Sequence, residues 1–191
     1  MADKKINKKT ETSSEITEQT EKPLRKKFRI RLKHIITAFL SLVAVAVLCS
    51  AFFLPVIQVS GDSMEPLLSN GDIVLLYKTD VFERGSLCCV SWKNKLMLKR
   101  VIGLSGDVIN IDKDGNVYVN DEFLEEPYVM DKALGECDIT LPYTVEEGEI
   151  FFLGDHRETS IDSRLSAVGC IEEKQVVGRV LVKLWSIEPE N

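Results

Sequence analysis

Histidine and paired cysteine, the usual ligands of structural zinc, are scarce in this sequence. Among 191 residues there are two histidines, His34 and His156, and no Cys-x-x-Cys pair. A zinc site of the ordinary ligand type is therefore not expected. The run "DKDGN" at 112–116 places acidic residues around a glycine, but it lacks the glycine placement and the distal glutamate of an EF-hand. We interpret this run as a hairpin turn and expect no bound metal.

The five cysteines are an odd number and form no obvious set of pairs. Cys88 and Cys89 are adjacent, so in an extended strand they point to opposite faces and are poor partners for each other. Cys49 lies within an apolar run. A disulfide between Cys137 and Cys170 is compatible with a location outside the cell, but the sequence alone leaves it open.

Charged residues are absent from positions 35–61, and residues 35–54 are apolar apart from one threonine and two serines. A helix of that length spans the roughly 30 Å hydrocarbon core of a bilayer. The sequence therefore predicts one transmembrane helix over residues 34–55. A cleaved secretory signal is the alternative, because Ala44 and Ala46 form an A-x-A triplet. The apolar run continues for eight residues beyond Ala46, which favours an uncleaved anchor.

The two sides of this segment differ in charge. Residues 1–34 carry a net charge of +6, whereas residues 35–191 carry −12, and six basic residues lie in "RKKFRIRLK" at 25–33. The positive-inside rule then predicts that residues 1–33 form a basic cytoplasmic tail and that residues 56–191 lie outside the cytoplasm in a cell-membrane, single-pass protein. We expect the tail to be disordered, because it is rich in Lys, Glu, Thr and Ser.

Helical periodicity is lacking after residue 55, where short β-branched runs alternate with Gly-containing turns. The pattern predicts a mainly β, antiparallel domain over residues 56–191, with a small hairpin and irregular insertion at about 113–150. The sequence "INIDKDGNVYV" should form a hairpin. The strands are expected at 56–59, 72–78, 87–92, 95–104, 107–111, 117–119, 149–155 and 176–185, the last of which should close the sheet.

Ser63 lies in "SGDSMEP", a turn-like stretch shortly after the predicted span. It is either a turn residue or a nucleophile, and a nucleophilic serine needs a base to remove its proton. His34 lies at the cytoplasmic edge of the membrane and cannot reach an external site. No S-x-x-K occurs in the chain, so the β-lactamase arrangement is excluded, and His156 or a lysine elsewhere remains.

Lys99 is a candidate for that base. In "LMLKRVI", strand alternation places Met97, Lys99 and Val101 on one face, so both neighbours of the lysine are apolar. Desolvation lowers the pKa of a lysine toward the roughly 7–8 that suits a general base. The alternative is that Lys99 extends from a sheet edge and keeps its charge in water.

A third cluster of polar residues, "GDHRETSIDSR" at 154–164, follows an apolar strand. It is either a solvated loop or a hydrogen-bonded scaffold around a site. In the second case Ser160 could orient a lysine amine, and Asp155, Asp162 and Arg164 could form buried ion pairs that hold the loop in place.

Together these segments resemble the type I signal peptidases, the membrane-anchored serine proteases that remove signal peptides from exported proteins. "SGDSMEPLL" is similar to the family's nucleophile motif, "LKRVIGLSGD" to its lysine motif and "GDHRETSIDSR" to its C-terminal motif, in the family's order. The segment "VYVNDEFLEEPY" is also similar to the hairpin between the second and third motifs. The resemblance covers about residues 30–185.

The resemblance implies a Ser/Lys dyad in which Ser63 attacks the scissile carbonyl and neutral Lys99 accepts its proton. Ser160 matches the serine that orients the lysine amine, while Asp162 and Arg164 match the residues that support that loop. Met64 would lie beside the substrate groove. A dyad of this kind needs no cofactor, and the implied partners are the lipid bilayer and exported preproteins with small residues at positions −1 and −3, with no nucleic acid.

Three positions depart from the common family pattern. Gly61 stands where some members carry a hydroxyl that contributes to the oxyanion hole, so stabilisation here would rest mainly on backbone N–H groups. Ser105 replaces a common proline, and His156 replaces a common asparagine. A non-catalytic homologue that binds or assembles surface proteins, and a peptidase dedicated to a restricted set of substrates, are the alternative functions.

Overall fold

The computed structural model describes residues 29–48, 50 and 52–186. The chain divides into two compact units, Met1–Ala51 and Phe52–Asn191. Most of the predicted cytoplasmic tail therefore lies outside the described residues.

The first unit contains a helix, Arg29–Leu48, that is long and apolar enough to cross a membrane by length and composition. It begins earlier than predicted, so residues 29–33, which we expected in the disordered tail, are helical. Arg, Lys and Leu are good helix formers, so the helix starts before the apolar run.

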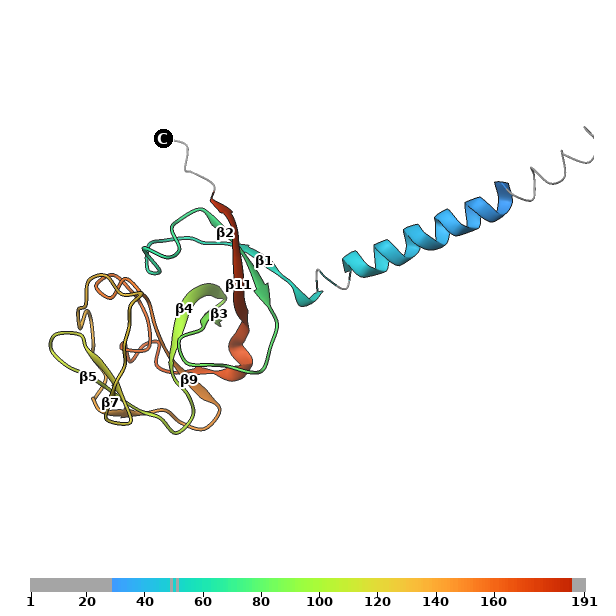
Figure 1. The fold of residues 1–191 in the computed structure, drawn as a ribbon. Helices are drawn as coiled ribbons and strands as arrows, with labels where there is room; N and C mark the ends of the chain where they lie inside the picture. Colours follow the sequence, from blue (N-terminus) through green and yellow to red (C-terminus); the bar gives the residue numbers. More distant parts are fainter. Residues whose placement is uncertain (1–28, 49, 51, 187–191) are drawn as a thin grey trace, which may run out of the picture. The chain divides into compact units, whose positions relative to one another are not determined.

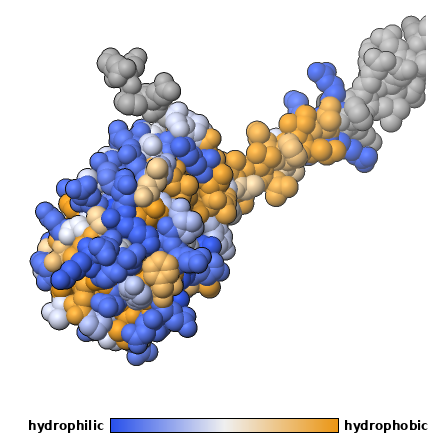
Figure 2. Space-filling view, turned by 60° about the vertical axis from the view of Figure 1, so that its left-hand side comes forward, coloured by the Kyte–Doolittle hydropathy of each residue, from blue (hydrophilic) through white to orange (hydrophobic). Residues whose placement is uncertain are grey.

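The hydroxyls of Ser41 and Ser50 donate hydrogen bonds to carbonyls about one turn earlier in the chain, at 2.8 and 2.9 Å. Hydroxyls satisfied within the segment are compatible with a lipid environment. Figure 2 shows a largely hydrophobic band along this helix.

The second unit consists of two antiparallel sheets (Figure 1). The larger sheet has seven strands in the order β1-β2-β11-β3-β4-β9-β10, and the smaller sheet has four in the order β7-β6-β5-β8. This confirms the predicted mainly β, antiparallel class with one N-terminal apolar helix. The strands are β1 (Val56–Gln58), β2 (Asp72–Tyr77), β3 (Leu87–Trp92), β4 (Lys95–Gly103), β5 (Val108–Ile111), β6 (Val117–Val119), β7 (Glu122–Phe123), β8 (Tyr143–Thr144), β9 (Glu149–Leu153), β10 (Ile171–Glu172) and β11 (Val176–Ser186), with a short 3-10 turn, Glu173–Gln175, before β11.

Strand β4 connects the three hydrophobic clusters of this unit. Leu98 packs in a cluster with Met64, Val101 belongs to a second cluster, and Ile102 packs in a third with the side chains of the smaller sheet. Because Leu98 and Val101 are buried in different clusters on either side of Lys99, the backbone of β4 at that lysine is held between two packed layers.

Strand β11 lies in the interior of the larger sheet. It pairs antiparallel with β2 through its C-terminal part and with β3 through its N-terminal part, with register shifts in both ladders (Figure 1). The predicted strand at 176–185 therefore joins two earlier hairpins and does not lie at the margin of the sheet.

The predicted hairpin around 112–116 is confirmed, since β5 and β6 pair antiparallel with Ile111 opposite Val117. Strands β7 and β8 lie within the region that we expected to be irregular. Each has two residues, which is too short for an alternating pattern to be recognised in the sequence.

Candidate active site

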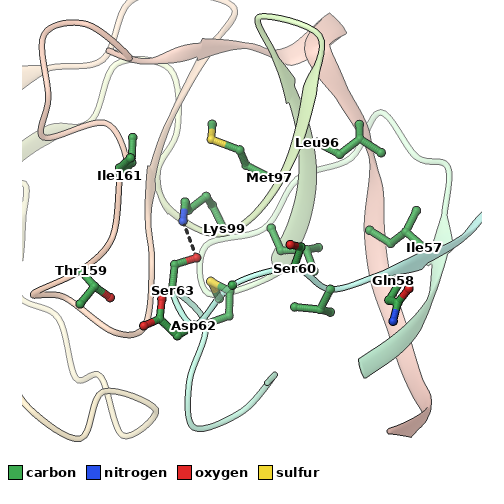
Figure 3. Close-up of a pocket in the computed structure, with 14 residues that line it drawn as sticks. Ile57, Gln58, Ser60, Asp62, Ser63, Leu96, Met97, Lys99, Thr159 and Ile161 are labelled. Carbon is green, nitrogen blue, oxygen red and sulfur yellow. Dashed lines mark hydrogen bonds between the residues drawn. The ribbon is translucent and has the colours of Figure 1, made fainter. Parts of the chain in front are cut away.

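A pocket of about 250 Å³ lies where strands β1 and β4 meet the turn that carries Ser63. Figure 3 shows Ser63 and Lys99 pointing toward each other within it. The lining combines apolar and polar side chains, and it consists of Ile57, Gln58, Val59, Ser60, Gly61, Asp62, Ser63, Met64, Leu96, Met97, Leu98, Lys99, Thr159 and Ile161. Three segments that are distant in the sequence thus form one pocket.

Ser63 and Lys99 are in direct contact. The Lys99 Nζ lies 2.8 Å from the Ser63 Oγ (Figure 3). The Lys99 side chain comes from β4, where it stands opposite Cys88 of β3, and the residue is 3% exposed. The Lys99 side chain therefore does not extend into bulk water, as the alternative required.

The environment of Lys99 favours the neutral amine. Burial lowers its pKa from 10.5 to about 8, because a desolvated ammonium loses its hydration. The carboxylate of Asp162 acts in the opposite direction, and the charge of Arg164 acts in the same direction as burial. An amine with a pKa of about 8 carries a proton part of the time and can accept one from a neighbouring hydroxyl.

The turn around Ser63 is fixed on both sides by hydrogen bonds. The Gly61 N–H donates to Asn70 Oδ1 at 3.1 Å, and the Glu65 N–H donates to the Asp62 carbonyl at 3.0 Å. Gly61 has a φ of +93°, a conformation that glycine adopts without strain, and this offers a physical reason for the absence of a side chain there. Met64 is 1% exposed and lines both the pocket and a core cluster.

The imidazole of His156 lies elsewhere. Its backbone N–H donates to the Ser63 carbonyl at 3.1 Å, but its side chain lines a second cavity and not the pocket that contains Ser63 and Lys99. The structure thus brings Lys99 to the serine hydroxyl and places the ring of the alternative base outside that pocket.

Asp162 and Arg164 form a buried pair within the third motif. Arg164 donates from Nε to Asp162 Oδ1 at 2.8 Å and from Nη2 to Oδ2 at 2.9 Å. Asp162 Oδ2 also accepts the Gly154 N–H at 3.0 Å, and Arg164 donates to the Arg157 carbonyl at 2.8 Å. Both side chains are about 1% exposed or less, so the motif is a buried scaffold and not a solvated loop.

Asp155 is also in a buried ion pair, but its partner comes from a different element. Its Oδ1 accepts from Arg100 Nε at 2.8 Å, and Arg100 follows Lys99 directly on β4. The Arg100 guanidinium also lies 3.8 Å from the ring centre of Tyr128. The pair therefore connects the third motif to the strand that carries the lysine.

The Ser160 hydroxyl is buried and has no hydrogen-bond partner within the part of the chain that the structure describes. The family resemblance implied that Ser160 orients the Lys99 amine, but the structure has no hydrogen bond between these two side chains. Gly154 packs closely against both Ser160 and Ser63, because a Cβ on Gly154 would lie 2.6 Å from the Ser63 carbonyl oxygen. Gly154 is a site residue that our sequence reasoning did not single out, although it opens the third motif.

A second pair that the sequence did not reveal joins Arg157 to Glu126. Arg157 Nη1 donates to Glu126 Oε2 at 3.0 Å, and both residues are buried. Glu126 lies in an acidic stretch with no pattern that distinguishes it, so no local signal could have identified it.

Cys137 and Cys170 are free thiols. Within residues 29–48, 50 and 52–186, no group of three His, Cys, Asp or Glu side chains could hold a metal ion.

Comparison with known proteins relates the chain to one family. The family model described as "Signal peptidase, peptidase S26" matches residues 32–185. The chain is 35% identical to a signal peptidase I of Bacillus licheniformis, an alignment that covers 75% of this chain and 83% of that protein. It is 34% identical to a signal peptidase IB of Staphylococcus aureus, with 70% and 82% covered.

A solved structure is also similar. The crystal structure of a signal peptidase I from Enterococcus faecalis V583 has 27% sequence identity and a TM-score of 0.45, and the match covers 53% of this chain and 97% of that one.

Proposed function

The chain belongs to the signal peptidase family, peptidase S26, whose members are serine endopeptidases that cleave signal peptides, and we propose that Ser63 and Lys99 perform this cleavage here. The observation that carries the proposal is the 2.8 Å contact between the buried Lys99 amine and the Ser63 hydroxyl inside one pocket. The position of Ser63 and Lys99 in motifs similar to those of the family supports it further.

The reaction begins with neutral Lys99, which accepts the proton of Ser63 as the serine oxygen attacks the scissile carbonyl. The tetrahedral intermediate then collapses, the peptide C–N bond breaks, and the lysine ammonium returns the proton to the leaving amine. Water, deprotonated by the neutral lysine, attacks the acyl-enzyme ester and releases the signal peptide. Burial of Lys99 serves this cycle because it keeps the pKa of the amine near the working pH.

The oxyanion requires hydrogen-bond donors, and we assign the Ser63 N–H as one of them. Among the described residues no acceptor is bonded to this N–H, while its neighbours Gly61 and Glu65 use theirs to hold the turn. Gly61 contributes no hydroxyl. A backbone donor held in a rigid turn is suited to this role because it needs no reorganisation during the reaction.

The signal peptide would lie between β1 and β4. Strand β1 is at the edge of the larger sheet, so its free side can pair with an extended peptide. The pocket walls around Ser63 include Ile57, Met64 and Leu98, and shallow apolar pockets of this kind suit small residues at positions −1 and −3.

We further propose that the apolar helix is a single-pass anchor with its N-terminus in the cytoplasm and residues 56–191 outside it. The net charge of +6 over residues 1–34 supports this orientation. Ser63 follows Leu54 by nine positions, which limits its distance from the end of the predicted span to roughly 30 Å. Such a nucleophile works near the bilayer surface, where the cleavage site of a membrane-inserted signal peptide emerges.

The test is cleavage of a purified preprotein whose signal ends in A-x-A. We expect Ser63→Ala and Lys99→Ala each to reduce kcat by at least about 1000-fold, because the two residues act as a unit. Lys95→Ala, an exposed lysine on the same strand, is the matched control and should cleave normally. Retained activity in either dyad variant would refute the dyad, and loss of activity in His156→Ala would revive the histidine base.

A non-catalytic role in binding or assembling surface proteins is the alternative. A binding protein has no need of a buried, partly neutral lysine against a serine, and burying the lysine is energetically costly. Wild-type protein that cleaves no preprotein under any condition would favour this alternative. Depletion of the protein followed by analysis of all exported preproteins would distinguish a general peptidase from one dedicated to few substrates.

A further inference from the structure

Residues 126–135, which lie between β7 and β8 in the chain, contact both segments that support the Ser63/Lys99 pair. We call these residues the strap. The supporting segments are β4 and the loop 154–164, and they contain three buried arginines, which are Arg100, Arg157 and Arg164. Each arginine has a partner in the strap, and these partners are, in the same order, the Tyr128 ring, the Glu126 carboxylate and the Leu134 carbonyl. One segment of ten residues therefore holds both parts of the support.

Glu126 is joined to the turn of the nucleophile through Arg157. The two residues are 5% and 1% exposed, and Arg157 donates from Nη1 to Glu126 Oε2 at 3.0 Å and from Nη2 to Oε1. Arg157 also donates from Nε to the Gly154 carbonyl at 3.1 Å. In the part of the chain that the structure describes, no other side chain is bonded to this guanidinium. Because a two-point pair with a carboxylate fixes the plane of a guanidinium, Glu126 sets how Arg157 holds Gly154.

Gly154 passes this constraint to Ser63. A Cβ on Gly154 would lie 2.6 Å from the Ser63 carbonyl oxygen, so the two backbones are already in close contact. The same carbonyl accepts the His156 N–H at 3.1 Å, from the residue just before Arg157. A displacement of residues 154–157 therefore moves the turn that carries the serine.

Glu126 is joined to the strand of the lysine through Tyr128. The Tyr128 hydroxyl donates to Glu126 Oε1 at 3.0 Å, and the centre of its ring lies 3.8 Å from the guanidinium of Arg100, which follows Lys99 on β4. Burial and the Glu126 charge raise the pKa of Tyr128, so its hydroxyl stays protonated and remains a donor. One buried carboxylate is thus connected to the support of both residues of the dyad.

We propose that Glu126 is a positioning residue for the cleavage reaction, which sets the Gly154 backbone against the turn of Ser63 through Arg157 and holds the Tyr128 ring over Arg100. The inference rests on the proposed function, and it adds a residue that does not line the pocket of Ser63 and Lys99. A buried ion pair is not required for stability, because apolar side chains of similar volume often stabilise a protein as well. Its geometry is specific, however, and a small displacement of reacting groups is enough to slow a reaction.

The first test is Glu126→Gln, which keeps the shape of the side chain but removes its charge and one acceptor oxygen. In cleavage of the A-x-A preprotein we expect kcat to fall about tenfold and KM to change by less than about twofold, because the pocket lining is intact. Glu125→Gln, at the neighbouring exposed glutamate, is the matched control and should cleave as the wild type does. An unchanged kcat in Glu126→Gln, or an equal loss in both variants, would overturn the proposal.

The second test separates positioning from stability, since Glu126→Gln also leaves the buried Arg157 without its charge partner. The double variant Glu126→Met/Arg157→Met replaces both charges with apolar side chains, and its thermal midpoint should return close to that of the wild type. We expect its kcat to stay at least about tenfold low, because no side chain then holds the Gly154 carbonyl. Recovery of kcat together with the midpoint, or a continued loss of both, would overturn the proposal and leave the pair a structural role. Failure of the proposed function would instead abolish cleavage by the wild type and by Glu125→Gln, so the two failures are distinguishable.

Discussion

At the scale of single residues, the main effect of the fold is on the pKa of Lys99. Its amine is buried beside a serine hydroxyl, and its pKa is lowered to about 8. At pH 7 about one molecule in ten then has the neutral amine, whereas an exposed lysine would be almost wholly charged. In the proposed dyad, the fraction of molecules in which Lys99 can accept the Ser63 proton therefore depends on pH.

We predict that kcat/KM rises with pH and levels off above about pH 8, because the reactive form is the one in which Lys99 has lost its proton. The exposed carboxylate of Asp62 raises the pKa of Lys99, so Asp62→Asn should move the midpoint to lower pH by a few tenths of a unit. Asp114→Asn, in a turn of the smaller sheet, is the control and should leave the profile unchanged. A profile that falls as pH rises from 6 to 8 would contradict the lysine base.

The same residue should lower the stability of the protein. Between pH 8 and 10.5 the unfolded chain binds a proton at Lys99 that the folded chain does not, so the stability contribution of this group rises with pH across that window. At pH 7 the cost of the buried amine is about 3 kcal/mol. We expect Lys99→Met to be inactive but more stable at pH 7 by up to about this amount, with the gain vanishing near pH 11.

Unfolding of the full chain in detergent, followed by the fluorescence of Trp92 and Trp185, would measure this change. Lys95→Met on the same strand is the control and should show no pH-dependent gain. A less stable Lys99→Met variant at pH 7 would show that packing, and not the charge, dominates at this position.

Part of this site could be predicted from single residues. Alternation along "LMLKRVI" correctly indicated apolar surroundings for Lys99, because strand geometry fixes which side chains share a face. The partners of the buried charges could not be predicted. Arg100 with Asp155 and Arg157 with Glu126 are separated by 55 and 31 residues, and the sequence pattern contains no information on contacts at that range.

At the scale of elements, the loop 154–164 determines how the site is supported. It is bonded to the Ser63 carbonyl by the His156 N–H, to β4 by Asp155 and to itself by Asp162 and Arg164. Gly154 is the point of closest approach, because the turn that carries Ser63 and the side chain of Ser160 both lie against its Cα. A loop with this many buried polar contacts is expected to be rigid.

We predict that Gly154→Ala reduces kcat by about 100-fold or more, since the added methyl group would displace the Ser63 carbonyl and a shift of this size misaligns the nucleophile. Cleavage of the A-x-A preprotein and the thermal midpoint of unfolding should be measured together. Glu158→Ala, an exposed change in the same loop, should cleave normally. Full activity in Gly154→Ala would mean that the loop is more compliant than its contacts suggest.

The strands with three or more residues were predictable because their apolar and β-branched runs lie between turn sequences, most of which contain glycine. Strands β7 and β8, with two residues each, were not, since their pairing is decided by the neighbours they meet. The helix start at Arg29 was also missed. The prediction used the apolar run, and the residues before that run also favour a helix.

At the scale of the whole molecule, the charge asymmetry of the chain predicts its topology. We expect Cys137, which is half-buried and a free thiol, to react with a membrane-impermeant maleimide in intact cells. Cys137→Ser should remove that label, as read from the modified peptide by mass spectrometry. Ser13→Cys in the same background should react only after the cells are permeabilised. Labelling of the tail cysteine in intact cells would reverse the proposed orientation.

The position of β11 has a consequence for fragments of this domain. The strand that joins β2 to β3 is formed by residues 176–186. A fragment that stops before Val176 would keep both the serine and the lysine but would lose the strand that holds their two hairpins in one sheet. The two side chains of the site therefore need a strand that follows the lysine by more than 70 positions in the chain before they can be held together.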